Sequence, residues 1–341
     1  MAVEFDGSVY SGGSLTRTGP LNGVSSSKKG TVSGWIKMDE DADPNIILDG
    51  TLVTNDFGNF VVGRISRTWT HPSFGTSVRQ KLYIYGTNSS GTKILELLSS
   101  NTLTSADGWT HFVASWDLEN SLAHLYIDRT DDLNDTNKTL TYDTIAYYQS
   151  GIVWGVGCHL GTWGGGAQPT PPNQFMNGYV DDLLFWPGVY VDLSDEDVLR
   201  KFISSDGLTN YGNPGPITLG PVGYGVDGSN PTGCPPAIFF NGSFSHNRGT
   251  GGAFTTNGTL SLVRSPSAYR YHATYPTPGE RWFDSDRGSF SYPRSRMVRQ
   301  RAGHKGLRVG VDEVDEPDRD DLRELDIPSI IFGEEDREEI V

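Results

Sequence analysis

The amino-acid sequence predicts an all-β protein in which antiparallel strands form a sandwich. Glycine contributes 42 of the 341 residues, and aromatic residues make up 11 %, including 15 tyrosines and 8 tryptophans. This mixture suits short strands joined by turns better than long apolar helices. Apolar residues also alternate with period two in several short, regularly spaced runs. Because almost no helical pattern separates these runs, the sequence favours an antiparallel sandwich over a parallel α/β sheet.

Several runs before residue 190 carry the strand pattern, in which successive side chains point to opposite faces of a sheet. One of them follows a turn at Asp56–Gly58, and the loop Asp117–Ser121 separates two others at a distance typical of a hairpin. In chain order, the predicted strands span 31–37, 59–65, 81–85, 109–116, 123–128 and 178–186.

One helix is predicted after the last of these strands. Ser194 is the expected N-cap and Asp197 lies three positions later, which approximates a capping box. Acidic residues precede basic ones, as the helix dipole prefers. We expect this helix to lie against the sandwich through an apolar face made of Val198, Leu199, Phe202 and Ile203.

Composition divides the chain into three regions. Residues 1–207 carry most of the apolar alternation and most of the tryptophans, and we expect them to form the sandwich domain. Residues 208–263 are rich in Gly, Pro, Asn and Thr and almost uncharged, which predicts a small β extension. Residues 264–341 are strongly charged and lack apolar periodicity, which predicts an extended arm that cannot fold alone.

Charge and the chain ends restrict the function classes. The formal net charge is −15, which argues against a nucleic-acid partner bound across the whole surface, because phosphate contacts need a net excess of Lys and Arg. No run approaches 18 apolar residues, and the first ten residues lack a signal-peptide pattern, so we expect no membrane insertion and synthesis in a cytoplasm. Cys158 and Cys234 form no metal-binding pattern and are expected to be reduced thiols.

The order of several motifs resembles the laminin-G-like, or concanavalin A-like, jelly roll. The strand Gly178–Trp186, followed by a short helix, is the ending typical of these domains. The resemblance spans about residues 1–207 and implies an antiparallel jelly-roll fold. Its other motifs, in chain order, are Phe5–Ser8, Val32–Ile36, Gly108–Val113 with Trp116, and Leu125–Asp128.

The next region resembles the segment that follows laminin-G-like domains in structural proteins of tailed bacteriophages. The resemblance rests on Pro221–Gly233, Pro236–Gly242 and Asn247–Leu260. It implies a virion structural protein made in the host cytoplasm: a homo-oligomeric decoration, fibre or tail- or neck-associated adhesion module. The jelly roll would face outward, and the arm would anchor it to capsid, neck or tail proteins. A soluble glycan-binding lectin is the alternative, and a glycan-cleaving enzyme is a third.

Catalytic residues are not expected. Glycoside hydrolases of this fold carry alternating carboxylates on one strand, whereas Glu313–Pro317 has the wrong spacing and a proline that would interrupt a central strand. Asp181 and Asp182 are adjacent in a strand, so they are expected to point to opposite faces. His111 and His124 are interpreted as structural residues of the sheet. We therefore predict that the protein is not an enzyme.

Asp181 is the candidate ligand for a structural cation. A carboxylate on the inner face of a sandwich needs a partner, either backbone amides or a cation. The family resemblance implies a structural calcium near this strand and the N-terminal loop, where Asp6 could supply a second oxygen ligand. Backbone hydrogen bonds are the alternative, and no other cofactor is expected.

Two aromatic loops are candidates for binding a host-surface glycan. Trp69 and Phe74 lie in one turn-rich stretch, and Trp163 lies among glycines in another. Jelly-roll loops of the resembled family often stack sugar rings on such side chains. The alternative is that each tryptophan folds onto the edge of the sandwich.

The arm is the predicted docking region. Residues 264–308 contain ten Lys and Arg against three Asp and Glu, with aromatics between them, and 312–339 contain fourteen acids against three Arg. The basic block could bind nucleic acid or wrap acidic protein surface, and the acidic excess of the chain favours the second. The apolar run Ile327–Phe332 resembles a docking peptide, or consists of chance hydrophobes. The predicted docking residues are Trp282, Phe283, Arg294, Arg296, Arg299, Arg301, Ile327, Ile330, Ile331 and Phe332.

Overall fold

The computed structural model divides the chain into two compact units, Met1–Thr274 and Tyr275–Val341. We describe each unit by itself. The residues that the structure describes are 2–6, 13–39, 45–52, 59–65, 79–160, 174–203, 229, 231–240, 246–263, 282–284 and 289–291.

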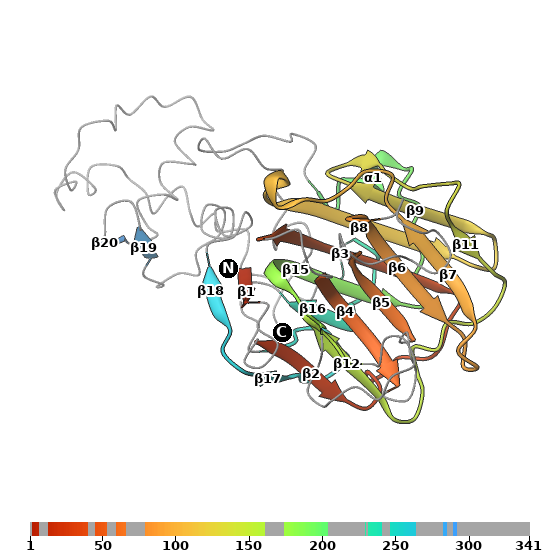
Figure 1. The fold of residues 1–341 in the computed structure, drawn as a ribbon, viewed down its shortest axis with the longest axis horizontal. Coiled ribbons are helices and arrows are strands. Elements are labelled where there is room, and N and C mark those ends of the chain that lie inside the picture. The colour runs from red at the N-terminus through yellow and green to blue at the C-terminus, as the bar shows by residue number, and fades with distance from the viewer. Residues whose placement is uncertain are drawn as a thin grey trace, which may run out of the picture. The chain divides into compact units, whose positions relative to one another are not determined.

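The first unit is an antiparallel sandwich of two eight-stranded sheets, which form two layers in Figure 1. The first sheet has the order β10-β9-β8-β3-β15-β1-β18, with β16 also paired to β15. Its strands are β1 (Ala2–Asp6), β3 (Lys29–Met38), β8 (Thr110–Asp117), β9 (Leu122–Ile127), β10 (Thr130–Asp131), β15 (Asn177–Pro187), β16 (Ile238–Phe240) and β18 (Ser261–Val263).

The second sheet has the order β11-β7-β6-β5-β4-β12-β2-β17. Smaller elements are the 3-10 helix η1 (Ser105–Asp107) and a two-stranded sheet of β13 (Cys158–His159) and β14 (Gln174–Phe175). The strands of the second sheet are β2 (Ser14–Thr18), β4 (Asn45–Leu52), β5 (Phe60–Arg64), β6 (Leu82–Thr87), β7 (Lys93–Leu98), β11 (Thr139–Leu140), β12 (Ile152–Val156) and β17 (Thr255–Asn257).

This architecture confirms the predicted fold class. Each of the strands predicted from alternation corresponds to an observed one, namely β3, β5, β6, β8, β9 and β15. Within the described residues, no helix is long and apolar enough to cross a membrane.

Aromatic side chains from both sheets fill the interior. Phe60 of the second sheet stacks on Phe185 of the first with ring centroids 4.8 Å apart. The Trp116 indole donates to the Tyr147 hydroxyl at 3.0 Å, so its polar atom is satisfied inside the core. Gly30 leaves the space that this indole occupies, because a Cβ there would lie 2.3 Å from a ring carbon. The core therefore depends on shape as much as on hydrophobicity.

A second apolar cluster covers the outer face of the first sheet. The helix α1 (Glu196–Leu199) and the residues after it contribute to this cluster, so the predicted packing of the helix on the sandwich is confirmed. The N-cap is Asp195, whose carboxylate accepts a hydrogen bond from the Asp197 amide at 2.9 Å. The prediction of Ser194 is wrong, because its hydroxyl donates to the Asp192 carboxylate at 2.6 Å instead.

Residues 231–263 complete both sheets where the structure describes them. β16 pairs with β15, β18 pairs with β1, and β17 pairs with β2. The first unit therefore continues to Thr274, and the expected boundary between 1–207 and 208–263 does not separate two compact units. The reason is pairing: short strands without strong alternation still satisfy the edges of an existing sheet.

The second unit contains a described β-hairpin. β19 (Trp282–Asp284) pairs with β20 (Ser289–Ser291), and the register places Phe283 opposite Phe290. The other predicted docking residues, from Arg294 to Phe332, lie outside the described residues.

Candidate functional site

The aromatic residues that the sequence nominated for glycan binding cannot be placed. Trp69, Phe74 and Trp163 all lie outside the described residues, so their role stays a prediction. The two cysteines are free in the structure, and Cys158 is buried. Burial raises the pKa of the Cys158 thiol to about 12, with the nearby Asp49 carboxylate adding to the effect.

The two residues proposed as calcium ligands lie on neighbouring strands, Asp6 on β1 and Asp181 on β15, at different levels along them. Asp6 pairs with Asn177, whereas Asp181 is the fourth residue further along, opposite Trp35. At about 3.3 Å per residue, the two backbone positions are about 13 Å apart. Within the described part of the chain, no group of three or more His, Cys, Asp or Glu residues could hold a metal ion. The calcium site stays a prediction.

A β-bulge changes the expected facing of the two adjacent aspartates. The pairing of β15 with β3 shifts between Asp181 and Leu184, and Asp182 has a φ of 44°. Strict alternation therefore does not hold here. The side chains of Asp181 and Asp182 are both buried.

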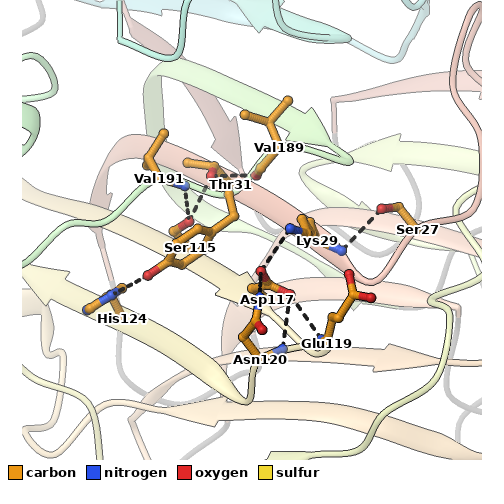
Figure 2. Close-up of polar contacts among 11 residues, drawn as sticks. Ser27, Lys29, Thr31, Ser115, Asp117, Glu119, Asn120, His124, Val189 and Val191 are labelled. Atoms are coloured by element: carbon orange, nitrogen blue, oxygen red, sulfur yellow. Dashed lines mark hydrogen bonds and ion pairs between the residues drawn. The ribbon is translucent and has the colours of Figure 1, made fainter.

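A polar network on the outer face of the first sheet holds the segment between β15 and α1 (Figure 2). Thr31 donates to the Val189 carbonyl at 2.8 Å, and Ser115 accepts from the Val191 amide at 2.9 Å. Nearby, His124 Nε2 lies 3.0 Å from the Tyr190 hydroxyl. Burial lowers the pKa of His124, although the Asp192 carboxylate opposes the shift. The bonds of Thr31 and Ser115 hold the backbone of this segment, and His124 holds the Tyr190 side chain against the sheet.

The same view shows how the β8–β9 hairpin is closed. The Asp117 carboxylate lies 2.9 Å from the Lys29 ammonium and accepts from the amides of Glu119 and Asn120 (Figure 2). Burial alone would raise the pKa of Asp117, but the bonds from Lys29 and the turn lower it. The bonds to the Glu119 and Asn120 amides hold the turn, and the ion pair ties the hairpin to β3.

His111 is a buried structural residue, as the sequence predicted. Its Nε2 lies 3.1 Å from the Ser33 hydroxyl, and its ring meets the Trp35 ring edge-on at 5.1 Å. Burial lowers the pKa of His111 to about 3, so the side chain is neutral at ordinary pH.

The outer face of the second sheet carries two buried carboxylates far apart. Asp49 lies on β4 and Glu96 on β7, with two strands between them. At about 4.8 Å per strand, their backbones are about 14 Å apart. Glycosidase carboxyl groups lie about 5–9.5 Å apart. Glu96 instead forms an ion pair with Lys93 at 2.6 Å. Asp49 and Glu96 are therefore not arranged as the carboxyl pair of a glycosidase.

Two tyrosines are exposed on the segment 141–151, which connects β11 to β12. The Tyr142 side chain is 64 % exposed and that of Tyr148 is 56 % exposed. Ile145 and Tyr147 between them are buried in the main core. The buried residues anchor the segment, so both exposed rings are held on an ordered backbone.

Backbone pairing explains the position of this segment. Ile145 forms a β-bridge with Ser27. On the other side, the Ala146 amide donates to the Thr87 carbonyl at 2.9 Å and the Thr141 amide donates to the Ile94 carbonyl at 2.8 Å. One side of the segment is thus bonded to the residues just before β3 of the first sheet. The other side is bonded to β6 and β7 of the second sheet.

Polar groups surround Tyr142, and we call Lys28, Asn88, Tyr142 and Asp143 the Tyr142 site. The Lys28 ammonium lies 3.5 Å from the centre of the Tyr142 ring. The Asp143 carboxylate accepts from the Asn88 side-chain amide at 2.8 Å and from the Thr144 backbone amide at 2.7 Å. These two bonds lower the pKa of Asp143, and the positive charge of Lys28 adds to the effect. Asp143 is therefore ionised and held in place, next to the exposed Tyr142 ring.

The sequence analysis missed the Tyr142 site. Residues 139–148 lack strict alternation, so nothing marked Tyr142 as exposed or Ile145 as buried. The site also joins Lys28, Asn88 and Asp143, which are brought together only by long-range pairing. A tyrosine next to an aspartate in a Thr-rich loop was the available signal, and it is weak.

No protein-family model matches this sequence, and no curated protein matches it. The strand order and pairing define the class of fold, an antiparallel β-sandwich of two eight-stranded sheets.

The solved structures to which this chain is similar share little sequence identity with it. It is similar to a heptameric SAP-like pentraxin from Limulus polyphemus, with 12 % identity, 76 % of this chain and 93 % of that chain covered, and a TM-score of 0.43. The mouse laminin α1 chain, domains LG4–5, has 14 % identity, coverage of 57 % and 42 %, and a TM-score of 0.32. A domain of a Geobacillus stearothermophilus arabinanase, solved with arabinotriose, has 16 % identity, coverage of 57 % and 73 %, and a TM-score of 0.35. Similarity this low concerns fold and says nothing about ligand.

Proposed function

We propose that the jelly roll binds carbohydrate through the Tyr142 site. The observation that carries this proposal is the exposed Tyr142 ring, which stands beside ionised and amide groups on an ordered loop. An aromatic ring offers an apolar platform for the C–H face of a sugar. The Asp143 carboxylate and the Lys28 ammonium can accept from and donate to sugar hydroxyls. A few placed polar groups beside an aromatic surface are what a small-ligand site needs.

The site is organised before any ligand arrives. The Asn88 side-chain oxygen accepts from the amides of Ser90 and Thr92, at 3.0 and 2.9 Å, so the turn holds this residue in place. Asn88 in turn holds Asp143. Binding would therefore immobilise few additional side chains, which lowers its entropic cost.

We propose binding without cleavage. The wide separation of Asp49 and Glu96 supports this, as does the role of Asp143 as a hydrogen-bonded surface group. Cleavage by the usual mechanism needs a second carboxyl group opposite the first. We therefore expect glycans to be recovered intact after incubation with the protein.

Replacing Tyr142 tests the proposed function. We expect Tyr142→Ala to weaken binding to the glycan that the wild-type chain selects on an array by about fivefold, the size of one aromatic contact of about 1 kcal/mol. Tyr142→Trp keeps a ring and should retain the affinity. Titration calorimetry of the full chain measures both.

Leu122→Ala is the matched control, because this residue is 43 % exposed at the start of β9, outside the Tyr142 site. Trp69→Ala and Trp163→Ala compare the candidates from the sequence. Wild-type affinity in Tyr142→Ala, with loss in either tryptophan variant, would transfer the proposed function to those loops.

A second proposed function is that of a bacteriophage virion component. Here the jelly roll would serve as a decoration, fibre or tail- or neck-associated module, assembled as a homo-oligomer. The β19–β20 hairpin supports this proposal, because an isolated two-stranded hairpin is at best marginally stable and gains from packing on a partner. The charge pattern of the arm also fits docking on other proteins.

Removing the arm tests the second function. We expect a chain ending at Thr274 to fold but to be lost from purified particles, whereas the full chain co-sediments with them. Thermal melting checks that the shortened chain is folded. Normal incorporation of this folded, shortened chain would contradict an anchoring role for the arm.

A further inference from the structure

Tyr148 is the second exposed ring on the segment 141–151, and the Tyr142 site does not include it. Its backbone amide donates to the Ser26 hydroxyl at 3.2 Å, and that hydroxyl donates to the Tyr148 carbonyl at 3.1 Å. The backbone on both sides of the ring is thus fixed by one serine. The ring itself is left exposed, at 56 %.

The two tyrosines are tied to one short stretch of chain. Ser26 holds Tyr148, and Lys28 covers one part of the Tyr142 ring. Residues two apart in a chain have Cα atoms at most about 7 Å apart. Both tyrosines therefore contact the same stretch of three residues, Ser26–Lys28, although they lie six residues apart in the sequence.

The described aromatic contacts include none between Tyr142 and Tyr148. Their Cα atoms are at most about 20 Å apart, the length of six extended residues. This span matches a linear oligosaccharide of several sugar units, so one such ligand can reach both rings.

A polar residue directly follows each of the two tyrosines. Asp143 follows Tyr142 and is part of the Tyr142 site, and Gln149 follows Tyr148. The Gln149 side-chain oxygen accepts from the Asn59 amide at 2.5 Å, which fixes its orientation. Hydrogen-bonding groups next to each apolar ring match the hydroxyls and C–H faces of an oligosaccharide.

The charge of this surface favours a neutral ligand. Lys28 and Asp143 balance each other within the Tyr142 site. Over residues 1–263, however, 25 Asp and Glu stand against 14 Lys and Arg. The resulting negative field repels polyanions on approach.

We infer that Tyr142 and Tyr148 form the two ends of one extended surface for a neutral, linear oligosaccharide, each ring stacking on a different sugar unit. This inference rests on the proposed carbohydrate-binding function. It adds the class of ligand and a second contact residue.

A ladder of oligosaccharides tests the inference with the full chain. The probes are cello-, xylo-, malto- and arabino-oligosaccharides of two to six units, titrated by calorimetry. We expect affinity for the bound series to rise with length. Tyr148→Ala should weaken binding of the hexasaccharide by about fivefold and leave the disaccharide unchanged. Tyr148→Phe keeps the ring and should behave as wild type.

The outcomes distinguish a failure of the extended surface from a failure of the proposed carbohydrate-binding function. Weaker binding in Tyr142→Ala but not in Tyr148→Ala, at every length, overturns the extended surface and leaves carbohydrate binding intact. No binding by any member of the panel overturns both. Oligogalacturonides of the same lengths test charge, and tighter binding of these anions overturns the assignment of a neutral ligand. Equal melting temperatures confirm that the variants are folded, as expected for exposed side chains.

Discussion

A chain ending at residue 207 is expected to fail to fold, whereas one ending at Thr274 is expected to fold. The structure gives the reason, because residues 231–263 supply strands to both sheets. β16 pairs with Leu183–Phe185 in the middle of β15. β18 and β17 cover the edges of β1 and β2. Removing them would expose unpaired backbone and open the core.

The size of the effect follows from the buried side chains that would be lost. Ile238, Phe240 and Phe254 belong to the main core, and Phe239 belongs to the cluster on the outer face. Each large apolar side chain stabilises the fold by about 1.5–3 kcal/mol when buried. Four of them contribute roughly 6–12 kcal/mol, which is comparable with the whole stability of a typical domain, about 5–15 kcal/mol.

Hydrogen bonds attach the same region to the sandwich. The Arg17 guanidinium donates to the carbonyls of Pro20 and Ala253 and to the Asn22 side chain. The Trp186 indole donates to the Cys234 carbonyl at 2.9 Å, and the Ala237 amide donates to the Phe185 carbonyl at 2.9 Å. Truncation would leave several of these partners unsatisfied.

Circular dichroism, thermal melting and gel filtration of both truncated chains check this prediction. The chain ending at Thr274 is the matched control, since it keeps every described strand of the first unit. A cooperative transition of the chain ending at residue 207, at the same temperature as the control, would show that 231–263 is dispensable. That result would also support the domain boundary at residue 207 that composition predicted.

The strands that sequence alone predicted are those long enough for apolar and polar residues to alternate visibly over several positions. Thr31–Lys37 and Trp109–Trp116 became the long strands β3 and β8, near the middle of the first sheet. Their side chains pack on the core through one face and on the helical cluster or solvent through the other. Such strands carry their own signal in the period of the pattern.

The extension and the candidate site could not be predicted in the same way. Ile238–Phe240 is a strand of three residues inside a Gly- and Pro-rich region, too short for a period to be visible. The Tyr142 site depends on pairings such as Ser27 with Ile145, which are separated by more than a hundred residues. The bulge at Asp182 also depends on the neighbouring strand. Each feature is a property of long-range contacts.

Acid is expected to destabilise the fold through His111, and this is the second large effect. The folded state holds the pKa of His111 at about 3 because the side chain is buried. In the unfolded chain the pKa is near 6.5. Between pH 6.5 and pH 3, His111 binds a proton in the unfolded chain but not in the folded chain. The free energy of unfolding therefore falls as pH falls from 6.5 toward 3. The full loss is on the order of 5 kcal/mol.

The titration of Asp128 changes the stability of the fold in the opposite direction to that of His111. Its carboxylate accepts from the His111 backbone amide at 2.8 Å. Burial of the carboxyl group raises its pKa to about 6, the bond from His111 opposes this, and the Asp107 charge adds to it. The folded state therefore binds this proton more readily than the unfolded chain, which adds stability as pH falls below 6. The residue is exposed overall, so solvent screening reduces its share.

Urea unfolding at pH 7, 6, 5 and 4 separates the two groups. Asp128→Asn keeps an oxygen acceptor for the His111 amide but cannot titrate, so stability should fall more steeply with acid than in the wild type. His111→Gln can still bond to Ser33 but cannot become charged, so the acid loss should shrink. Titrations of other residues are shared by all three chains and cancel when their slopes are compared. Equal slopes in His111→Gln and the wild type would mean that His111 accepts a proton inside the folded protein. The buried position between Ser33 and Trp35 would then have to open in acid, which hydrogen exchange of the β3 and β8 amides would detect.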